Sequence, residues 1–267
     1  MSFIRVGAIV LRQLYLIRTS FSRVLPLFIW VAVDILLWGF LTRYLNTVAA
    51  AGFNFVPAML GAVLLWDFFI RIMQGVTMSF FEDVWSRNFL NVFSTPISLR
   101  EYLAGMVLTS IVTSSIGIAV MFLLAVWIFG FSFLSYGIVI IPFLLVLFMF
   151  GIALGIAASA LVLRLGPAAE WFIWPIPAII SPFVGVLYPI SVLPQWMQAV
   201  SRALPPSYVF ESLRAVVFGG RVSWAHLFLS LGLTLLYIFL SCLFFKLTYR
   251  HALNSGLIAR YSAENLG

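Results

Sequence analysis

Long apolar segments dominate this sequence and restrict the class of fold that it can form. Six of them are each about as long as the roughly 20 residues that a helix needs to cross the hydrocarbon core of a bilayer. Of the 267 residues only 9% are charged, against about a quarter in an ordinary soluble domain. We therefore predict an all-α integral membrane protein with a single domain over residues 1–267. The six predicted transmembrane helices are residues 24–45, 55–80, 102–129, 137–163, 171–190 and 224–249.

Two of the predicted spans carry residues that bear on packing. In the fourth, Gly151 and Gly155 are four residues apart and form a face on which a neighbouring helix can pack closely. The fifth contains Pro175, Pro177 and Pro182. Because proline lacks a backbone N–H and clashes with the preceding turn, we expect this span to be broken.

Residues 1–23 form an amphipathic segment. At about 100° per residue, Arg5, Arg12, Thr19 and Arg23 fall on one narrow stripe, and the remaining surface is mostly apolar. Helices of this kind lie in the plane of the membrane interface. We predict an interfacial helix whose arginines are directed toward the lipid headgroups.

A polar island at residues 81–101 separates the second span from the third. Pro96 disfavours helix at the residue before it, so a first short helix should end near Ser94. Ser98 and Glu101 then match a capping box that opens the next helix. A short helix across the end of a membrane bundle is a surface on which a motor protein can push. The same pattern also fits an ordinary interfacial loop helix.

Three ionisable residues, Asp34, Asp67 and Arg71, lie deep in the first two spans. These spans are joined by a short loop, so we expect them to be neighbours. Arg71 could then meet Asp34 across the helix pair and Asp67 within its own helix. Charges inside a membrane are costly and are functional candidates by default. The cluster is either functional or a structural ion pair that locks the two spans.

The segment 191–221 is mostly apolar but too short and broken to span the membrane. Pro194 and Pro205 each begin a short helix. We predict a helical hairpin that dips back from the outer face, rather than a plain surface loop. Within it Glu211 and Arg214 are three residues apart and can pair, as part of an exit gate or as a surface pair.

The basic residues predict the orientation of the chain. With the N-terminus in the cytoplasm, ten basic residues face the cytoplasm and four face outward, which obeys the positive-inside rule. Both termini are then cytoplasmic. The ten are Arg5, Arg12, Arg18, Arg23, Arg87, Arg100, Arg164, Lys246, Arg250 and Arg260, and the four are Arg43, Arg202, Arg214 and Arg221.

Several classes of function are excluded by what the sequence lacks. It contains no glycine-rich phosphate-binding loop ending in Lys-Ser or Lys-Thr, so any ATP that drives this protein must bind another chain. Cys242 is the single cysteine, and no residues suggest a metal site or a catalytic constellation. The net charge of +7 is what a membrane protein needs on its cytoplasmic side, so we predict no nucleic-acid partner.

Two stretches carry a family resemblance. Residues Glu82 to Glu101 resemble the cytoplasmic coupling segment of the permeases of type-2 ABC exporters. Residues Tyr188 to Met197, followed by Leu204-Pro205-Pro206 and Glu211-Ser212-Leu213-Arg214, resemble the extracytoplasmic signature of the same family. The two stretches occur in the expected order, in a chain of the expected size.

The resemblance implies a permease subunit of an ATP-driven exporter in the bacterial cytoplasmic (inner) membrane. It pairs with a second permease, expected to be identical, and with two ATPase subunits that bind ATP and Mg²⁺. The expected cargo is lipophilic or amphipathic: a lipid, a drug-like molecule or a lipid-linked sugar. The alternative is a proton-coupled secondary transporter that uses Asp34 and Asp67. The resemblance assigns ATPase coupling to Glu82, Asp83, Val84, Trp85, Arg87, Asn88 and Phe89, and an outer gate to Pro189, Pro194, Trp196, Glu211 and Arg214.

Overall fold

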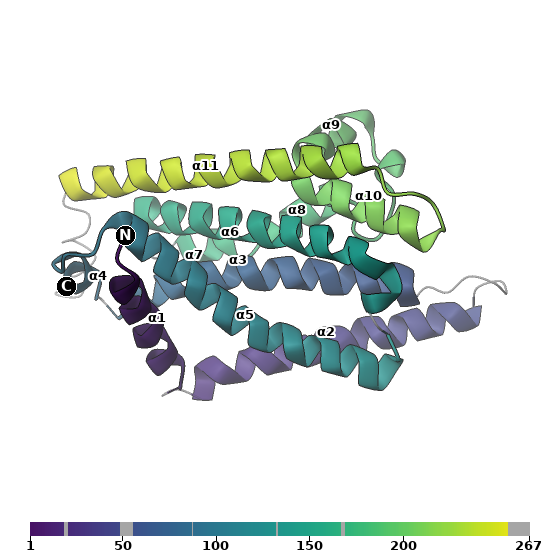
Figure 1. Ribbon diagram of the computed structural model, residues 1–267, viewed down its shortest axis with the longest axis horizontal. Coiled ribbons are helices and arrows are strands. Elements are labelled where there is room, and N and C mark those ends of the chain that lie inside the picture. Colours follow the sequence, from purple (N-terminus) through teal and green to yellow (C-terminus); the bar gives the residue numbers. More distant parts are fainter. Residues whose placement is uncertain (19–20, 49–55, 87, 132, 167–168, 256–267) are drawn as a thin grey trace.

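The computed structural model describes residues 1–18, 21–48, 56–86, 88–131, 133–166 and 169–255. Within these ranges the chain forms helices and no strand, as the apolar pattern predicts. Its longest helices run along the long axis of the molecule, in the layer order α11, α6, α3, α5 and α2 (Figure 1). They are α2 (Phe21–Val48), α3 (Gly61–Trp85), α5 (Leu99–Phe129), α6 (Ile140–Leu165) and α11 (Trp224–Asn254).

Four helices in the described ranges are long and apolar enough to cross a membrane. They are Ala58–Trp85, Leu99–Phe129, Tyr136–Leu165 and Trp224–Asn254, and they correspond to the second, third, fourth and sixth predicted spans. The first predicted span lies within α2. The fifth is interrupted at Trp174 and Pro175, between α7 (Glu170–Ile173) and α8 (Ile176–Val184). Since nine residues of helix are only about 14 Å long, α8 is too short to cross a bilayer alone.

The two ends of the bundle carry different short elements (Figure 1). At one end lie α1 (Phe3–Arg18) and α4 (Phe89–Phe93). The other end holds α8, α9 and α10, which pack on one another. The shorter elements toward that end are η1 (Val56–Leu60), η2 (Phe133–Val139), η4 (Ile190–Val192), α9 (Gln195–Ala203) and α10 (Pro205–Val217).

The centre of the fold is α3, which is packed closely by α6. A side chain at Gly151 would place its Cβ 3.0 Å from Ile72 Cβ, and one at Gly155 would place it 2.7 Å from Val76 Cβ. The absence of side chains at these two glycines lets the helix backbones approach each other. The predicted close-packing face of the fourth span is therefore confirmed, and its partner is α3.

On its other side α3 is hydrogen-bonded to α5. Ser110 Oγ donates to the carbonyl oxygen of Ile72 at 2.9 Å, and Ser114 Oγ donates to that of Arg71 at 3.1 Å. Hydroxyl groups that bond across helices are the usual polar contacts inside membranes. These bonds join α3 and α5 along the middle of the bundle.

The position of α2 differs from the prediction. It packs along α5 and against η1, and does not form a packed pair with α3. The reason is a close fit near the end of α5: Gly39 lacks the Cβ that would overlap the Phe129 ring, and Phe40 meets the same ring edge-on at 5.5 Å. The first two predicted spans are therefore neighbours at η1, which begins the second span and packs against α2, whereas further along the bundle α2 packs on α5 rather than on α3.

Candidate functional site

The coupling segment is built differently from the predicted short helix. Instead of starting a new helix near residue 81, α3 continues through Glu82 and Asp83 to Trp85. A single five-residue helix, α4, lies between the end of α3 and Pro96. The backbone N–H of Asn88 donates to the carbonyl oxygen of Asp83 at 3.1 Å, which closes the turn between the two helices.

Burial separates the predicted coupling residues into two groups. Asp83 is 0% exposed and Glu82 is 7% exposed, so neither acid presents a surface to another protein. Val84 and Asn88 are half-buried, whereas Trp85 is 46% exposed. Ser86, Asn91, Ser94, Thr95 and Pro96 are also exposed. Arg87 and the side chain of Phe89 lie outside the described residues.

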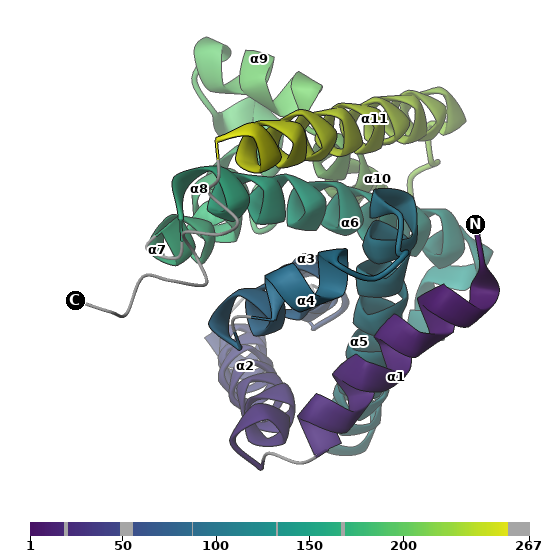
Figure 2. The same ribbon diagram turned by 90° about the vertical axis from the view of Figure 1, so that its left-hand side faces the viewer.

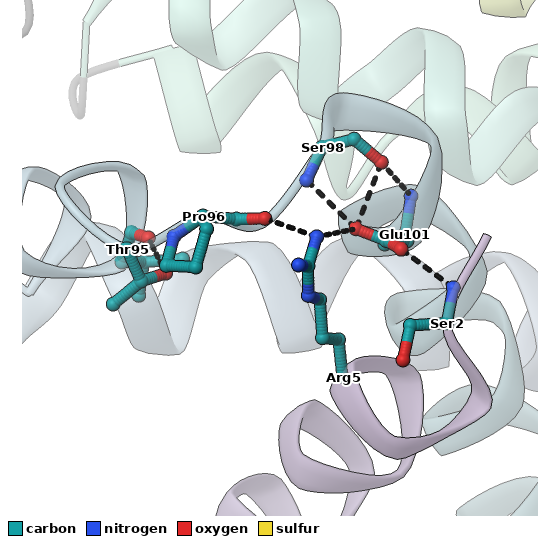
Figure 3. A network of polar contacts seen from close by, with 7 residues as sticks. Ser2, Arg5, Thr95, Pro96, Ser98 and Glu101 are labelled. Carbon is teal, nitrogen blue, oxygen red and sulfur yellow. Dashed lines mark hydrogen bonds and ion pairs between the residues drawn. The ribbon is translucent and has the colours of Figure 1, made fainter.

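The predicted capping box at the start of α5 is confirmed. Glu101 N–H donates to Ser98 Oγ at 3.4 Å, while Ser98 N–H donates to the Glu101 carboxylate at 2.9 Å. The same carboxylate accepts a hydrogen bond from Ser2 N–H at 2.6 Å. Glu101 therefore joins the start of α5 to the start of α1 (Figure 3).

The basic stripe of α1 faces the protein. Arg5 Nη1 donates to the carbonyl oxygen of Pro96 at 2.5 Å and lies 3.6 Å from the Glu101 carboxylate (Figure 3). Arg12 Nη2 donates to Asp83. The prediction that these two arginines are directed toward lipid headgroups is wrong, because two acids of the bundle attract them. Thr19 and the side chain of Arg23 lie outside the described residues.

Asp83 joins three helices. One carboxylate oxygen pairs with Arg12 of α1, and the other accepts a hydrogen bond from Tyr102 Oη of α5 at 2.8 Å. Asp83 itself belongs to α3. Seen from the end of the bundle, α1 crosses α5 beside the end of α3 (Figure 2). The contribution of Tyr102 was not predicted, although Tyr102 directly follows the capping residue Glu101 in the first turn of α5.

The intramembrane charges are only partly arranged as predicted. Arg71 Nε donates to Asp67 Oδ2 at 2.7 Å, so the predicted pair within α3 is confirmed. Asp34 is half-buried and close enough to both groups to interact with them electrostatically. Asp34 is thus near Arg71 as predicted, although α2 packs mainly against α5 and η1 rather than against α3.

The predicted gate residues form a clasp around the chain between α8 and α9. Arg214 donates to Glu211 at 2.7 Å and to the carbonyl oxygens of Gly185 and Tyr188, at 2.6 and 2.9 Å. Glu211 accepts the N–H of Ile190 at 2.9 Å. Burial lowers the pKa of the Arg214 guanidinium, and the Glu211 carboxylate opposes this shift. The pair predicted from its spacing is confirmed, and it ties the end of α8 to α10.

Three other predicted gate residues lie around this clasp. Pro189 precedes η4, and Pro194 precedes α9. Trp196 is 64% exposed and meets the Phe183 ring at 6.2 Å. These residues belong to η4 and α9 or immediately precede them, and α9 packs with α8 and α10 at the end of the bundle opposite α4 (Figure 1).

Comparison with known protein families identifies this arrangement. The family model described as ABC-2 type transporter matches residues 8–218, which is more than half of the chain. The chain belongs to the ABC-2 type transporter family. A comparison with curated proteins found no match.

The ABC-2 match includes the coupling segment, the intramembrane charges and the clasp. Membrane domains of this family are transport subunits that work with ABC ATPases, so this ABC-2 protein is a membrane transport permease. That assignment agrees with four apolar membrane-length helices and with a polar surface at one end of the bundle.

Proposed function

We propose that this ABC-2 permease is the membrane-spanning subunit of an ATP-driven exporter. It moves a lipophilic or amphipathic cargo, such as a lipid, a drug-like molecule or a lipid-linked sugar, out of the cytoplasm or the inner leaflet. Two ATPase subunits that hold ATP and Mg²⁺ bind its cytoplasmic end, and a second identical permease completes the complex. The protein resides in the bacterial cytoplasmic membrane with both termini inside.

The observation that carries this proposal is the exposed surface of the coupling segment. Trp85, Ser86 and Asn91 are exposed at the junction of α3, α4 and α5. An exposed tryptophan at such a junction is the kind of anchor that dominates protein interfaces. Movement of this surface reaches α3 and α5 directly, because α4 is only five residues long.

The proton-coupled alternative is not supported. Asp67 is paired with Arg71, and ABC-2 membrane domains work with ABC ATPases.

The surface of the permease that is proposed to bind the ATPase is tested by replacing its exposed tryptophan, Trp85, with alanine. We expect Trp85→Ala to reduce co-purification of the ATPase about tenfold or more, because loss of about 1.4 kcal/mol of binding energy has that effect. Phe89→Asp, in α4, should act in the same direction. The measurement is the amount of ATPase retained by the tagged permease in detergent.

Trp196→Ala is the matched control, since Trp196 is also exposed but lies at the opposite end of the bundle. It should retain the ATPase fully. Equal retention by Trp85→Ala and Trp196→Ala would contradict the assignment of the coupling surface.

Sidedness is tested by cysteine labelling in a Cys242→Ser background. Asn91→Cys in α4 and Gln195→Cys in α9 both replace exposed residues at opposite ends of the bundle. In intact cells a membrane-impermeant maleimide should label only Gln195→Cys, and both should react after the membrane is permeabilised. Labelling of both variants in sealed cells would overturn the proposed orientation.

A further inference from the structure

One face of α1 is fitted to the base of α3 and α5. Arg5, Ile9, Arg12 and Gln13 follow the i, i+4, i+7, i+8 spacing of a single helix face. Each of them makes a contact with the bundle. In addition to the two arginine pairs, Gln13 Nε2 donates to the carbonyl oxygen of Ser79 at 3.0 Å.

The approach between α1 and α5 is close as well as polar. A Cβ at Gly105 would lie 2.6 Å from Ile9 Cγ2, so only glycine permits this contact. Ile9 is 4% exposed as a result. The two helices are thus held by an apolar contact that lies between the two ion pairs along α1.

The ion pairs secure both ends of this contact. Arg5 reaches the Glu101 carboxylate at the start of α5, while Arg12 reaches Asp83 at the end of α3. Seven residues of helix separate the two arginines by about 10 Å. Arg12 Nε is buried with no hydrogen-bond acceptor among the described residues, so the ion pair to Asp83 is what holds this guanidinium.

The opposite face of α1 is apolar and exposed. Phe3 is 91% exposed, Ile4 85% and Leu11 57%. Apolar side chains on an interfacial helix enter the boundary between headgroups and acyl chains. With Arg5 and Arg12 bound to the bundle, these apolar residues form the face of α1 that is available to lipid.

We propose that Arg12 and Arg5 are positioning residues for coupling: they clamp α1 across the end of α3 and the start of α5. The clamp holds the two helices as one body, so that a push on the coupling segment moves both instead of spreading them apart. This inference rests on the proposed function, because it requires an ATPase that moves α4. Lipid contact through Phe3 and Ile4 keeps α1 at the membrane surface during that movement.

The test uses the full chain with its ATPase in lipid nanodiscs, in a Cys242→Ser background. Val192→Cys supplies a label site that is 70% exposed next to the clasp. The rate of reaction with a membrane-impermeant maleimide is measured with and without ATP and vanadate. Bound ATPase and thermal stability are measured on the same samples.

We expect the nucleotide to change the labelling rate of the parent. In Arg12→Gln the effect of nucleotide on the labelling rate should be smaller by a factor of about five or more. A factor of about five is at the low end of the coupling usually found between two sites. The ATPase should stay bound. Exchange of the charges, Arg12→Asp with Asp83→Arg, should restore part of the response, which a loss of general stability would not explain.

Arg18→Gln is the matched control, because it removes the same charge from an exposed position at the end of α1. Its response should equal that of the parent. If Arg12→Gln is not folded, Arg5→Gln tests the other end of the clamp, since that side chain is 44% exposed and its loss is better tolerated.

A full nucleotide response in folded Arg12→Gln and Arg5→Gln would overturn the clamp while leaving the proposed function in place. A parent that binds the ATPase but shows no response would overturn the nucleotide-driven movement itself, and the role of the clamp with it.

Discussion

Arg71→Leu is expected to destabilise the protein by about 3–5 kcal/mol, the usual result of removing one partner from a buried ion pair. Asp67, which is 8% exposed, would keep its carboxylate in the interior without the Nε donor at 2.7 Å. Asp34 would lose its favourable electrostatic interaction with Arg71. The measurement is the yield of monodisperse protein together with its thermal unfolding in detergent.

Two further variants show whether the pair is the cause. Asp67→Asn with Arg71→Gln should recover most of the stability, because it removes both charges and keeps groups that can hydrogen-bond. Arg43→Leu is the control: its guanidinium is exposed over the Phe129 ring at 5.8 Å, and it should cost about 1 kcal/mol or less. If Arg71→Leu unfolds at the parent temperature, the pair does not stabilise α3.

Gly155→Val is expected to be the most damaging change to helix packing. Its Cβ would lie 2.7 Å from Val76 Cβ and 2.8 Å from the carbonyl oxygen of Met73. The backbone oxygen cannot move without shifting α3, so the helices must separate. Overpacking of this kind typically costs about 1–3 kcal/mol. A lower unfolding temperature and a lower yield would report it.

Gly232→Val gives the comparison for this substitution. Gly232 is exposed within α11, and a side chain there meets nothing within 4 Å. Both variants replace a helical glycine by valine, so the difference between them isolates packing from helix propensity. Equal stability of the two would mean that α6 and α3 can separate without cost.

Several features of this permease could be predicted from the spacing of residues that are close together in the sequence. The capping box of Ser98 and Glu101, the pair of Asp67 and Arg71, and the pair of Glu211 and Arg214 all join residues three or four apart. Helical geometry brings such residues together wherever the helix lies. The length and hydropathy of the apolar segments likewise predicted the helical membrane fold, because a helix needs about 20 consecutive apolar residues to cross the bilayer.

Features that depend on distant residues were not predictable in this way. The helical periodicity of α1 identified a basic stripe but could not tell whether lipid headgroups or protein would receive it. The answer depends on Asp83, which lies 71 residues beyond Arg12. In the same way, the polar sequence around Glu82 suggested a surface, whereas the fold buries both acids of that segment.

The partner of α2 shows the same limit. A short connection suggested that the first two spans pack together. They meet only at η1, the start of the second span, and α2 otherwise packs on α5, where Gly39 accommodates the Phe129 ring. Helix formation in the long apolar segments and ion pairing within a helix could be predicted, because these interactions lie within about one helical turn. Which helices meet and which charges become buried could not be predicted, because shape complementarity and desolvation arise between residues that the chain brings together from far apart.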